Sequence, residues 1–118
     1  RSAVIDSPYD TLDEAIAVRG RFVRASSHLV DAFRRAKEQR TAVSIEQIRP
    51  IERVAQLTRP TLFVFARADE WIGEDVRVRY RQELSPSSEL VEVDGRHTGH
   101  FDVGWIVRVA RFFERHAL

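Results

Sequence analysis

The stretch PTLFVFARADEW, residues 60–71, decides how this chain folds. Leu62 to Phe65 form a continuous run of β-prone apolar residues, which is typical of a strand buried on both faces. Pro60 fits this assignment, because proline is accepted at the first position of a strand. Strands buried on both faces belong to parallel sheets covered by helices. The stretch therefore predicts an α/β protein.

Two further strands are expected on either side of it in the sequence. Residues 2–10, SAVIDSPYD, contain a short apolar run from Ala3 to Ile5 that suits a buried strand running into a loop. Residues 88–93, SELVEV, end in alternating apolar and polar residues, which also favours a strand.

Helical patterns separate these strands. Thr11 and Glu14 have the capping-box spacing, and the apolar stripe behind them predicts one long helix ending near Arg40, with Gly20 as a point where it bends. The stripe consists of Ala15, Phe22, Leu29 and Ala36, beside Ile16, Val23 and Val30.

Three shorter helical patterns follow. Ser44 and Gln47 offer a cap for one or two helical turns before Pro50, and Val76, Tyr80 and Leu84 share one face of a later helix. The closing amphipathic helix is marked by Val103, Ile106, Val107, Ala110, Phe113 and Ala117. The order β-α-β-α-β-α predicts three layers, a parallel sheet with helices on both faces, and we assign residues 1–118 to a single partial domain.

Composition excludes several classes of function. With 43% hydrophobic and 31% charged residues and a net charge of +1, the chain has an ordinary globular composition and no basic excess for nucleic acid. The absence of Cys excludes disulfides and thiolate nucleophiles. No apolar run approaches the roughly 18 residues of a membrane span, and no signal peptide is evident, so we expect a cytoplasmic protein without a membrane partner. Because the chain has no Met and begins with Arg1, we expect it to be a piece of a longer protein.

Polar side chains follow each predicted strand. Asp6 follows the first strand, Asp69 and Glu70 the second, and His97 and His100 the third. The carboxyl ends of parallel strands meet at one edge of the sheet, and neighbouring strands lie about 4.8 Å apart. A carboxylate and an imidazole are therefore expected side by side, as an acid–histidine pair that needs a nucleophile.

At these residues the chain resembles the C-terminal part of an α/β-hydrolase, in the serine-hydrolase and aminopeptidase-like branch. The likeness runs through SAVIDSPYDTLDEA, RPIERVAQLTRPTLFVFARADEWIGEDVRVRYRQEL and ELVEVDGRHTGHFD to the final helix. LFVFARAD resembles the acid motif of that family and GRH its histidine motif, which implies Asp69 as the triad acid and His97 as the triad histidine. Ala66 stands where the family usually has glycine. No serine here lies in a G-x-S-x-G elbow, so the resemblance implies a serine upstream, in a missing N-terminal half of the domain.

The resemblance implies a serine hydrolase, esterase-like or peptidase-like, that cleaves a small-molecule ester or amide without a cofactor. The alternative is a non-catalytic binding or structural module of the same fold, and acyl transfer and dehalogenation use the same scaffold. The isolated piece is expected to be inactive and, because Ala3 to Ile5 would form an unpaired apolar edge, to associate with other chains.

Other residues keep alternative roles. Asp6 is a rival for the triad acid, because some α/β-hydrolases place the acid after the preceding strand. His100 is expected to be structural or to line a pocket, and a metal site made from His97 and His100 lacks further ligands. His28 and His116 are expected on the surface or in helix packing, and Tyr9, Trp71 and Trp105 in the core or in an acyl pocket.

Overall fold

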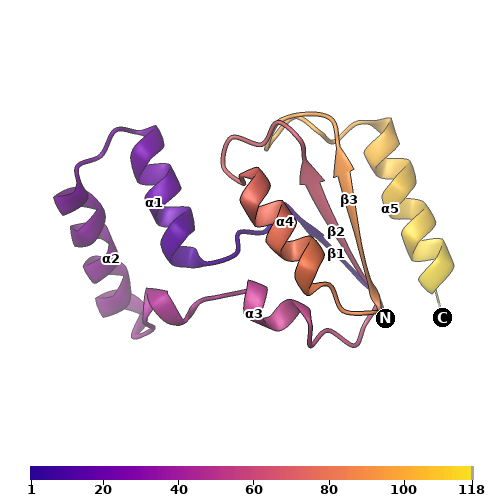
Figure 1. Ribbon diagram of the computed structural model, residues 1–118, viewed down its shortest axis with the longest axis horizontal. Coiled ribbons are helices and arrows are strands. Elements are labelled where there is room, and N and C mark those ends of the chain that lie inside the picture. Colours follow the sequence, from indigo (N-terminus) through magenta and orange to yellow (C-terminus); the bar gives the residue numbers. More distant parts are fainter. Residues whose placement is uncertain (118) are drawn as a thin grey trace.

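A three-stranded parallel sheet organises the computed structural model, which describes residues 1–117. Strands β1 (Ala3–Asp6), β2 (Thr61–Ala66) and β3 (Ser88–Val93) lie in the order β1-β2-β3. The central strand β2 is buried over its whole length, as its apolar run predicts. The predicted α/β class and parallel sheet are confirmed (Figure 1).

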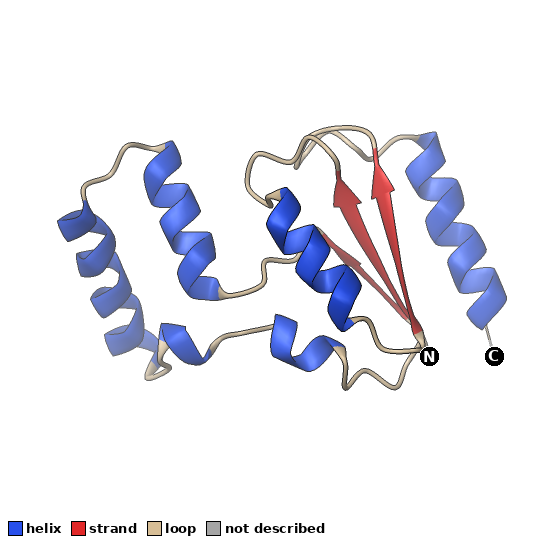
Figure 2. Cartoon of the chain, in the orientation of Figure 1, coloured by secondary structure: helices blue, strands red, loops and turns tan. Residues whose placement is uncertain are grey.

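Helices cover both faces of this sheet (Figure 2). Successive side chains of a strand point to opposite faces. Phe63 and Phe65 accordingly pack against Tyr80, on the side of α3 (Ile51–Val54) and α4 (Glu74–Glu83). Leu62 and Val64 pack on the other side against α5 (Val103–His116). The three-layer prediction is therefore confirmed.

The predicted long helix is wrong, because two helices occupy its place: α1 (Leu12–Phe22) and α2 (Ser27–Thr41). Arg24 adopts a left-handed φ of 55°, and the N–H of Ala25 donates to the Gly20 carbonyl at 2.9 Å, which closes the end of α1. Ser26 then caps α2 by accepting a hydrogen bond from the Leu29 N–H. The chain therefore reverses direction and α2 lies beside α1 (Figure 1).

The predicted bend at Gly20 is wrong. Gly20 instead permits close packing of α1 against α2. A Cβ atom on Gly20 would lie 2.7 Å from Cγ2 of Val30. The predicted cap at Ser44 is also wrong. The short 3₁₀ turn η1 (Ile45–Gln47) follows Ser44, but the Ser44 side chain makes no capping hydrogen bond to it.

The apolar stripe predicted for the closing helix is also wrong. Val103 and Ile106 are 75% and 56% exposed, whereas Phe112 is fully buried against the sheet, with Trp105 and Val109 beside it. The apolar residues of α5 cover one broad face, and only the part of it around Phe112 meets the sheet, so periodicity alone did not identify the buried residues.

Strand β1 is half exposed rather than buried, because within residues 1–117 it pairs only with β2 and forms an edge of the sheet. Within residues 1–117, no helix combines the length and apolar character that crossing a membrane requires.

Candidate active site

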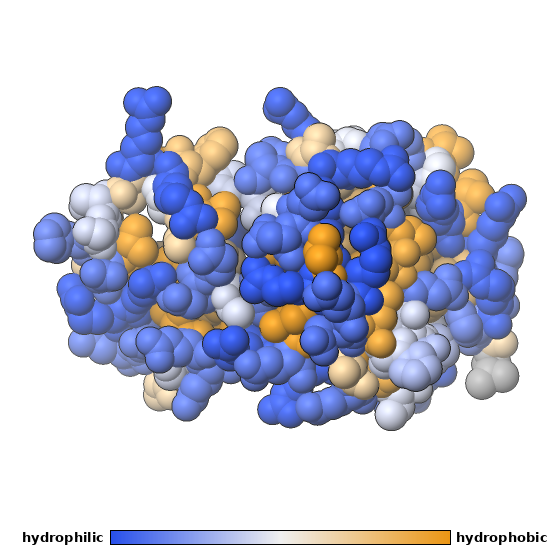
Figure 3. Space-filling model, in the orientation of Figure 1, coloured by the Kyte–Doolittle hydropathy of each residue, from blue (hydrophilic) through white to orange (hydrophobic). Residues whose placement is uncertain are grey.

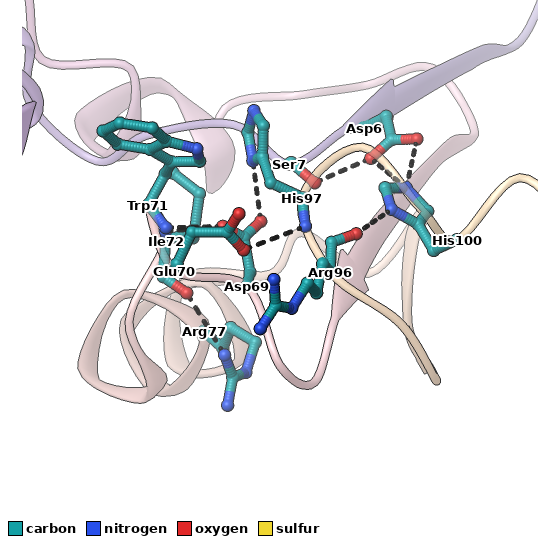
Figure 4. Close-up of polar contacts among 10 residues, drawn as sticks. All are labelled: Asp6, Ser7, Asp69, Glu70, Trp71, Ile72, Arg77, Arg96, His97 and His100. Carbon is teal, nitrogen blue, oxygen red and sulfur yellow. Dashed lines mark hydrogen bonds and ion pairs between the residues drawn. The ribbon is translucent and has the colours of Figure 1, made fainter.

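Asp69 and His97 form a direct contact at the carboxyl edge of the sheet. Asp69 lies in the loop after β2 and His97 in the loop after β3, and these two strands are neighbours. His97 Nδ1 lies 2.8 Å from Asp69 Oδ2 (Figure 4). An ionised carboxylate only accepts hydrogen bonds, so Nδ1 carries the proton and donates it. In the neutral imidazole Nε2 then keeps a free lone pair, which is the tautomer of a general base.

The carboxylate of Asp69 is held from its other side by the backbone. The N–H groups of Trp71 and Ile72 donate to Oδ1 at 2.8 and 2.9 Å, and the side chain is fully buried. Each oxygen of Asp69 therefore has its own donors, and the one facing His97 is fixed in direction. The Asp69 carboxylate therefore holds the His97 ring in one orientation.

The loop between β3 and α5 carries His97 to this position. Gly95 has a φ of 128°, and its carbonyl accepts a hydrogen bond from the Ala68 N–H at 3.0 Å, which ties this loop to the loop after β2. The His97 N–H donates to Glu70 Oε2 at 3.4 Å. The turn at Gly95 thus brings both loops together.

A second acid–histidine pair lies beside the first one. His100 Nε2 is 2.9 Å from both oxygens of Asp6, at the end of β1, and Nδ1 is 2.8 Å from the Arg96 carbonyl oxygen (Figure 4). His100 is fully buried. Burial alone would lower the pKa of His100, but the hydrogen bonds to the Arg96 carbonyl and to Asp6, together with the charges of Asp6 and Asp69, raise it above its ordinary value. Both partners are acceptors, so only the imidazolium satisfies both contacts.

The sequence left Asp6 and Asp69 as alternative acid partners for His97, and the two pairs distinguish them. Asp6 contacts His100 and not His97, while Asp69 contacts His97. The sequence did not predict the Asp6–His100 pair, since the two residues are 94 positions apart and each also has an ordinary role in a turn or a loop.

A cavity of about 300 Å³ opens beside His97. The residues that line it come from all three loops and from α1: Asp6, Ser7, Tyr9, Arg19, Ile72, His97, Thr98 and Phe101. Ser7 has a left-handed φ of 46°, and its hydroxyl donates to Asp6 at 2.8 Å. No sequence pattern indicated Arg19, because it belongs to a helix that precedes β2 by about forty residues in the chain.

The remaining histidines and aromatic residues lie apart from the Asp69–His97 contact or support it. His28 is exposed on α2, and His116 lies near Glu89 at the end of α5. Trp105 packs against the core, whereas Trp71 lies edge-on to His97, with ring centroids 6.5 Å apart. Among residues 1–117, no three His, Asp or Glu side chains gather closely enough to hold a metal ion.

Comparison with solved structures identifies the architecture. An esterase from Pyrococcus furiosus, Pf2001, superimposes on 98% of this chain with a TM-score of 0.72 and 18% sequence identity. The chain shares its fold with part of an esterase. Two further crystal forms of Pf2001 match with TM-scores of 0.67, at 18% and 19% identity.

This chain spans only 45% of the length of Pf2001 in the first of these matches, and 44% in the other two. No protein-family model matches the sequence, and no curated protein matches it. The three-layer α/β architecture predicted from the sequence is therefore shared with part of the larger fold of this esterase.

Proposed function

We propose that this chain supplies the acid and the histidine of a serine hydrolase, with Asp69 and His97 as two members of its catalytic triad. The observation that carries the proposal is the 2.8 Å contact between His97 Nδ1 and the buried Asp69 carboxylate, on an imidazole that borders a cavity. The esterase fold supports it. In this proposal the 118 residues are part of one domain, and a serine outside them completes the site.

The chemistry follows from the orientation of the imidazole. Nε2 accepts the proton of the serine hydroxyl while the serine oxygen attacks the carbonyl carbon of an ester or small amide. The same proton then passes to the leaving alcohol or amine. A water molecule, deprotonated in turn by His97, attacks the acyl-serine, and His97 returns that proton to the serine oxygen as the acid leaves. Asp69 keeps Nδ1 protonated and stabilises the imidazolium that forms in each step.

The experiment that tests this proposal is hydrolysis of p-nitrophenyl esters and aminoacyl amides by the full-length protein and its variants. We expect Asp69→Asn to lower kcat by about 10⁴-fold, as the loss of the triad acid does in serine proteases, and His97→Asn to lower it at least as much. Serine-directed covalent labelling should require the complete protein, since no serine of this chain is proposed as the nucleophile.

Matched controls are available on the same loops and helices. Asp94→Asn removes an exposed carboxylate that contacts Arg67, and His28→Asn removes an exposed histidine of α2. Both should keep full activity. Full activity of Asp69→Asn and His97→Asn, or an upstream sequence without a G-x-S-x-G serine, would instead favour a non-catalytic module of this fold.

A further inference from the structure

A second, larger cavity lies between α1, α2 and η1. Its volume is about 840 Å³, within the range of about 300 to 1,000 Å³ that is usual for sites of small molecules. The lining is mostly apolar and includes Ile16, Val23, Leu29, Phe33, Val43 and Ile48. Figure 3 shows hydrophobic side chains gathered in the hollow between these helices, at the left of the view.

Helix α2 directs its apolar side chains to this cavity rather than to the core. None of its residues is buried, and Leu29 and Phe33 are 61% and 48% exposed although they face the cavity. Such an apolar lining is stabilised when an apolar molecule displaces water from it. The cavity therefore suits a long hydrocarbon chain.

The charged residues that line the cavity are both cations, Arg19 and Lys37. In residues 1–117 neither of them has an ion-pair partner, and no carboxylate lines the cavity. Lys37 Nζ lies 5.7 Å from the ring centre of Phe33, at the apolar wall. An apolar cavity with uncompensated cations is complementary to a chain that carries a negative charge.

Arg19 also connects this cavity to the candidate active site, because it lines the smaller cavity beside His97 as well. Its guanidinium lies 5.3 Å from the ring centre of Trp71, and that ring is edge-on to His97. Phe22, at the end of α1, contacts the same tryptophan, with ring centroids 4.5 Å apart. A chain bound between α1 and α2 would thus have one end next to the acid–histidine pair.

We propose that the cavity between α1 and α2 binds the hydrocarbon chain of a long-chain carboxylate, the acid that is released from a fatty acyl ester. Hydrolysis breaks the acyl carbon–oxygen bond of the ester, adds water across it, and yields the alcohol, the carboxylate and a proton. The assignment of fatty acyl esters as the substrate class rests on the proposed function, whereas binding of the carboxylate does not.

Calorimetric titration of the full-length protein tests the binding directly, with dodecanoate, butanoate and dodecyltrimethylammonium below their micellar concentrations. Dodecanoate should bind at least about 100-fold more tightly than butanoate, because each buried methylene contributes about fourfold in affinity. It should also bind at least about tenfold more tightly than the cationic amphiphile. Equal affinity for the two amphiphiles, or no binding of either, contradicts the proposal.

Variants locate the site on the protein. Leu29→Glu places a carboxylate in the cavity and should weaken dodecanoate binding at least about tenfold, whereas His28→Glu adds the same charge to exposed α2 surface and should not. Arg19→Gln and Lys37→Gln should reduce the preference for dodecanoate over the cation while circular dichroism shows an unchanged fold. An unchanged affinity of Leu29→Glu for dodecanoate would show that dodecanoate binds outside this cavity.

The two proposals fail separately. His97→Asn should bind dodecanoate as the wild type does while losing esterase activity. Binding of dodecanoate by a protein that hydrolyses no ester would leave the cavity assigned and refute the hydrolase. Hydrolysis of short and long esters at equal kcat/KM, without dodecanoate binding, would support the hydrolase and refute the assignment of the cavity.

Discussion

His97 and His100 lie three residues apart in one loop, yet their side chains have different surroundings. The side chain of His97 is 24% exposed and borders a cavity, and its Nδ1 is hydrogen-bonded to Asp69. His100 has both nitrogens on acceptors and is fully buried. Neither ring nitrogen of His100 can meet a substrate, because each is bonded to an acceptor inside the protein and the side chain is buried. His100 therefore suits a structural role, in which it joins the end of β1 to the loop that carries His97.

The raised pKa of His100 predicts a dependence of stability on pH. A group whose pKa is raised by folding contributes stability that is complete below its unfolded pKa, about 6.5, and is lost as the pH rises through its folded pKa. We therefore expect the free energy of unfolding to fall as the pH is raised above about 6.5. His100→Gln should flatten this profile, and His28→Gln, which changes an exposed histidine, should leave it as it is. Urea denaturation between about pH 6 and pH 9 measures both; a profile in His100→Gln as steep as in the wild type would contradict the assignment.

At this scale the sequence predicted one pair and missed the other. The Asp69–His97 contact follows from two strands that are neighbours and two motifs at their ends. The Asp6–His100 pair depends on the position of β1 next to β2, and on burial that no local pattern records.

The loop between β3 and α5 contains two glycines, Gly95 and Gly99, and its geometry depends on Gly95. Gly95 has a φ of 128°, and a Cβ atom there would lie 2.9 Å from Cβ of His100, so Gly95→Ala forces both backbone strain and a collision. We expect Gly95→Ala to lower the free energy of unfolding by about 1–3 kcal/mol, and to displace His97 and so reduce the hydrolase activity that we propose.

Gly99→Ala is the matched control in the same loop. Its Cβ would meet nothing closer than the Arg96 nitrogen at 4.0 Å, so its effect should stay within about 0.5 kcal/mol. Chemical denaturation of the two variants compares them, and equal losses would show that the geometry of Gly95 is not what matters.

Among the elements, strands were predicted better than helix faces. The run from Leu62 to Phe65 has only one placement, in the middle of a sheet. The apolar face of α5 is broad, so its sequence allows more than one orientation on the sheet, and the contacts of Phe112 select the one adopted. The break between α1 and α2 uses Arg24 rather than glycine at the left-handed position, which removes the usual signal for a helix end.

The chain as a whole is elongated. Its radius of gyration is 16.0 Å, against about 13.5 Å for a compact chain of this length, and its extents are 48 × 28 × 24 Å. Helices α1 and α2 project to one side of the sheet (Figure 1). Apolar surface remains exposed at both ends, on α2 and on α5, and Ile5 is 36% exposed on the edge strand.

This exposed surface predicts self-association of residues 1–118 expressed alone, at micromolar concentration. Ile106→Lys removes apolar surface from α5 and should shift the equilibrium toward monomer, as measured by sedimentation velocity. Glu114→Gln changes the net charge by the same amount on the same helix and should have little effect. A wild-type chain that sediments as a monomer would contradict the prediction.

The pairing of β1 with β2 also has a consequence for folding kinetics. Between these strands the chain makes an excursion over residues 7–60, through α1, α2, η1 and α3, whereas β2 and β3 are joined by the single helix α4. Closing the longer loop costs more chain entropy, and non-local pairings form slowly. The unit β2-α4-β3, which positions Asp69 and His97, should therefore assemble early, and β1 should dock afterwards. The hydrogen bond between Asp6 and His100 links residues 94 apart, so it should form among the last contacts. Once formed, it stabilises the loop between β3 and α5 against the end of β1.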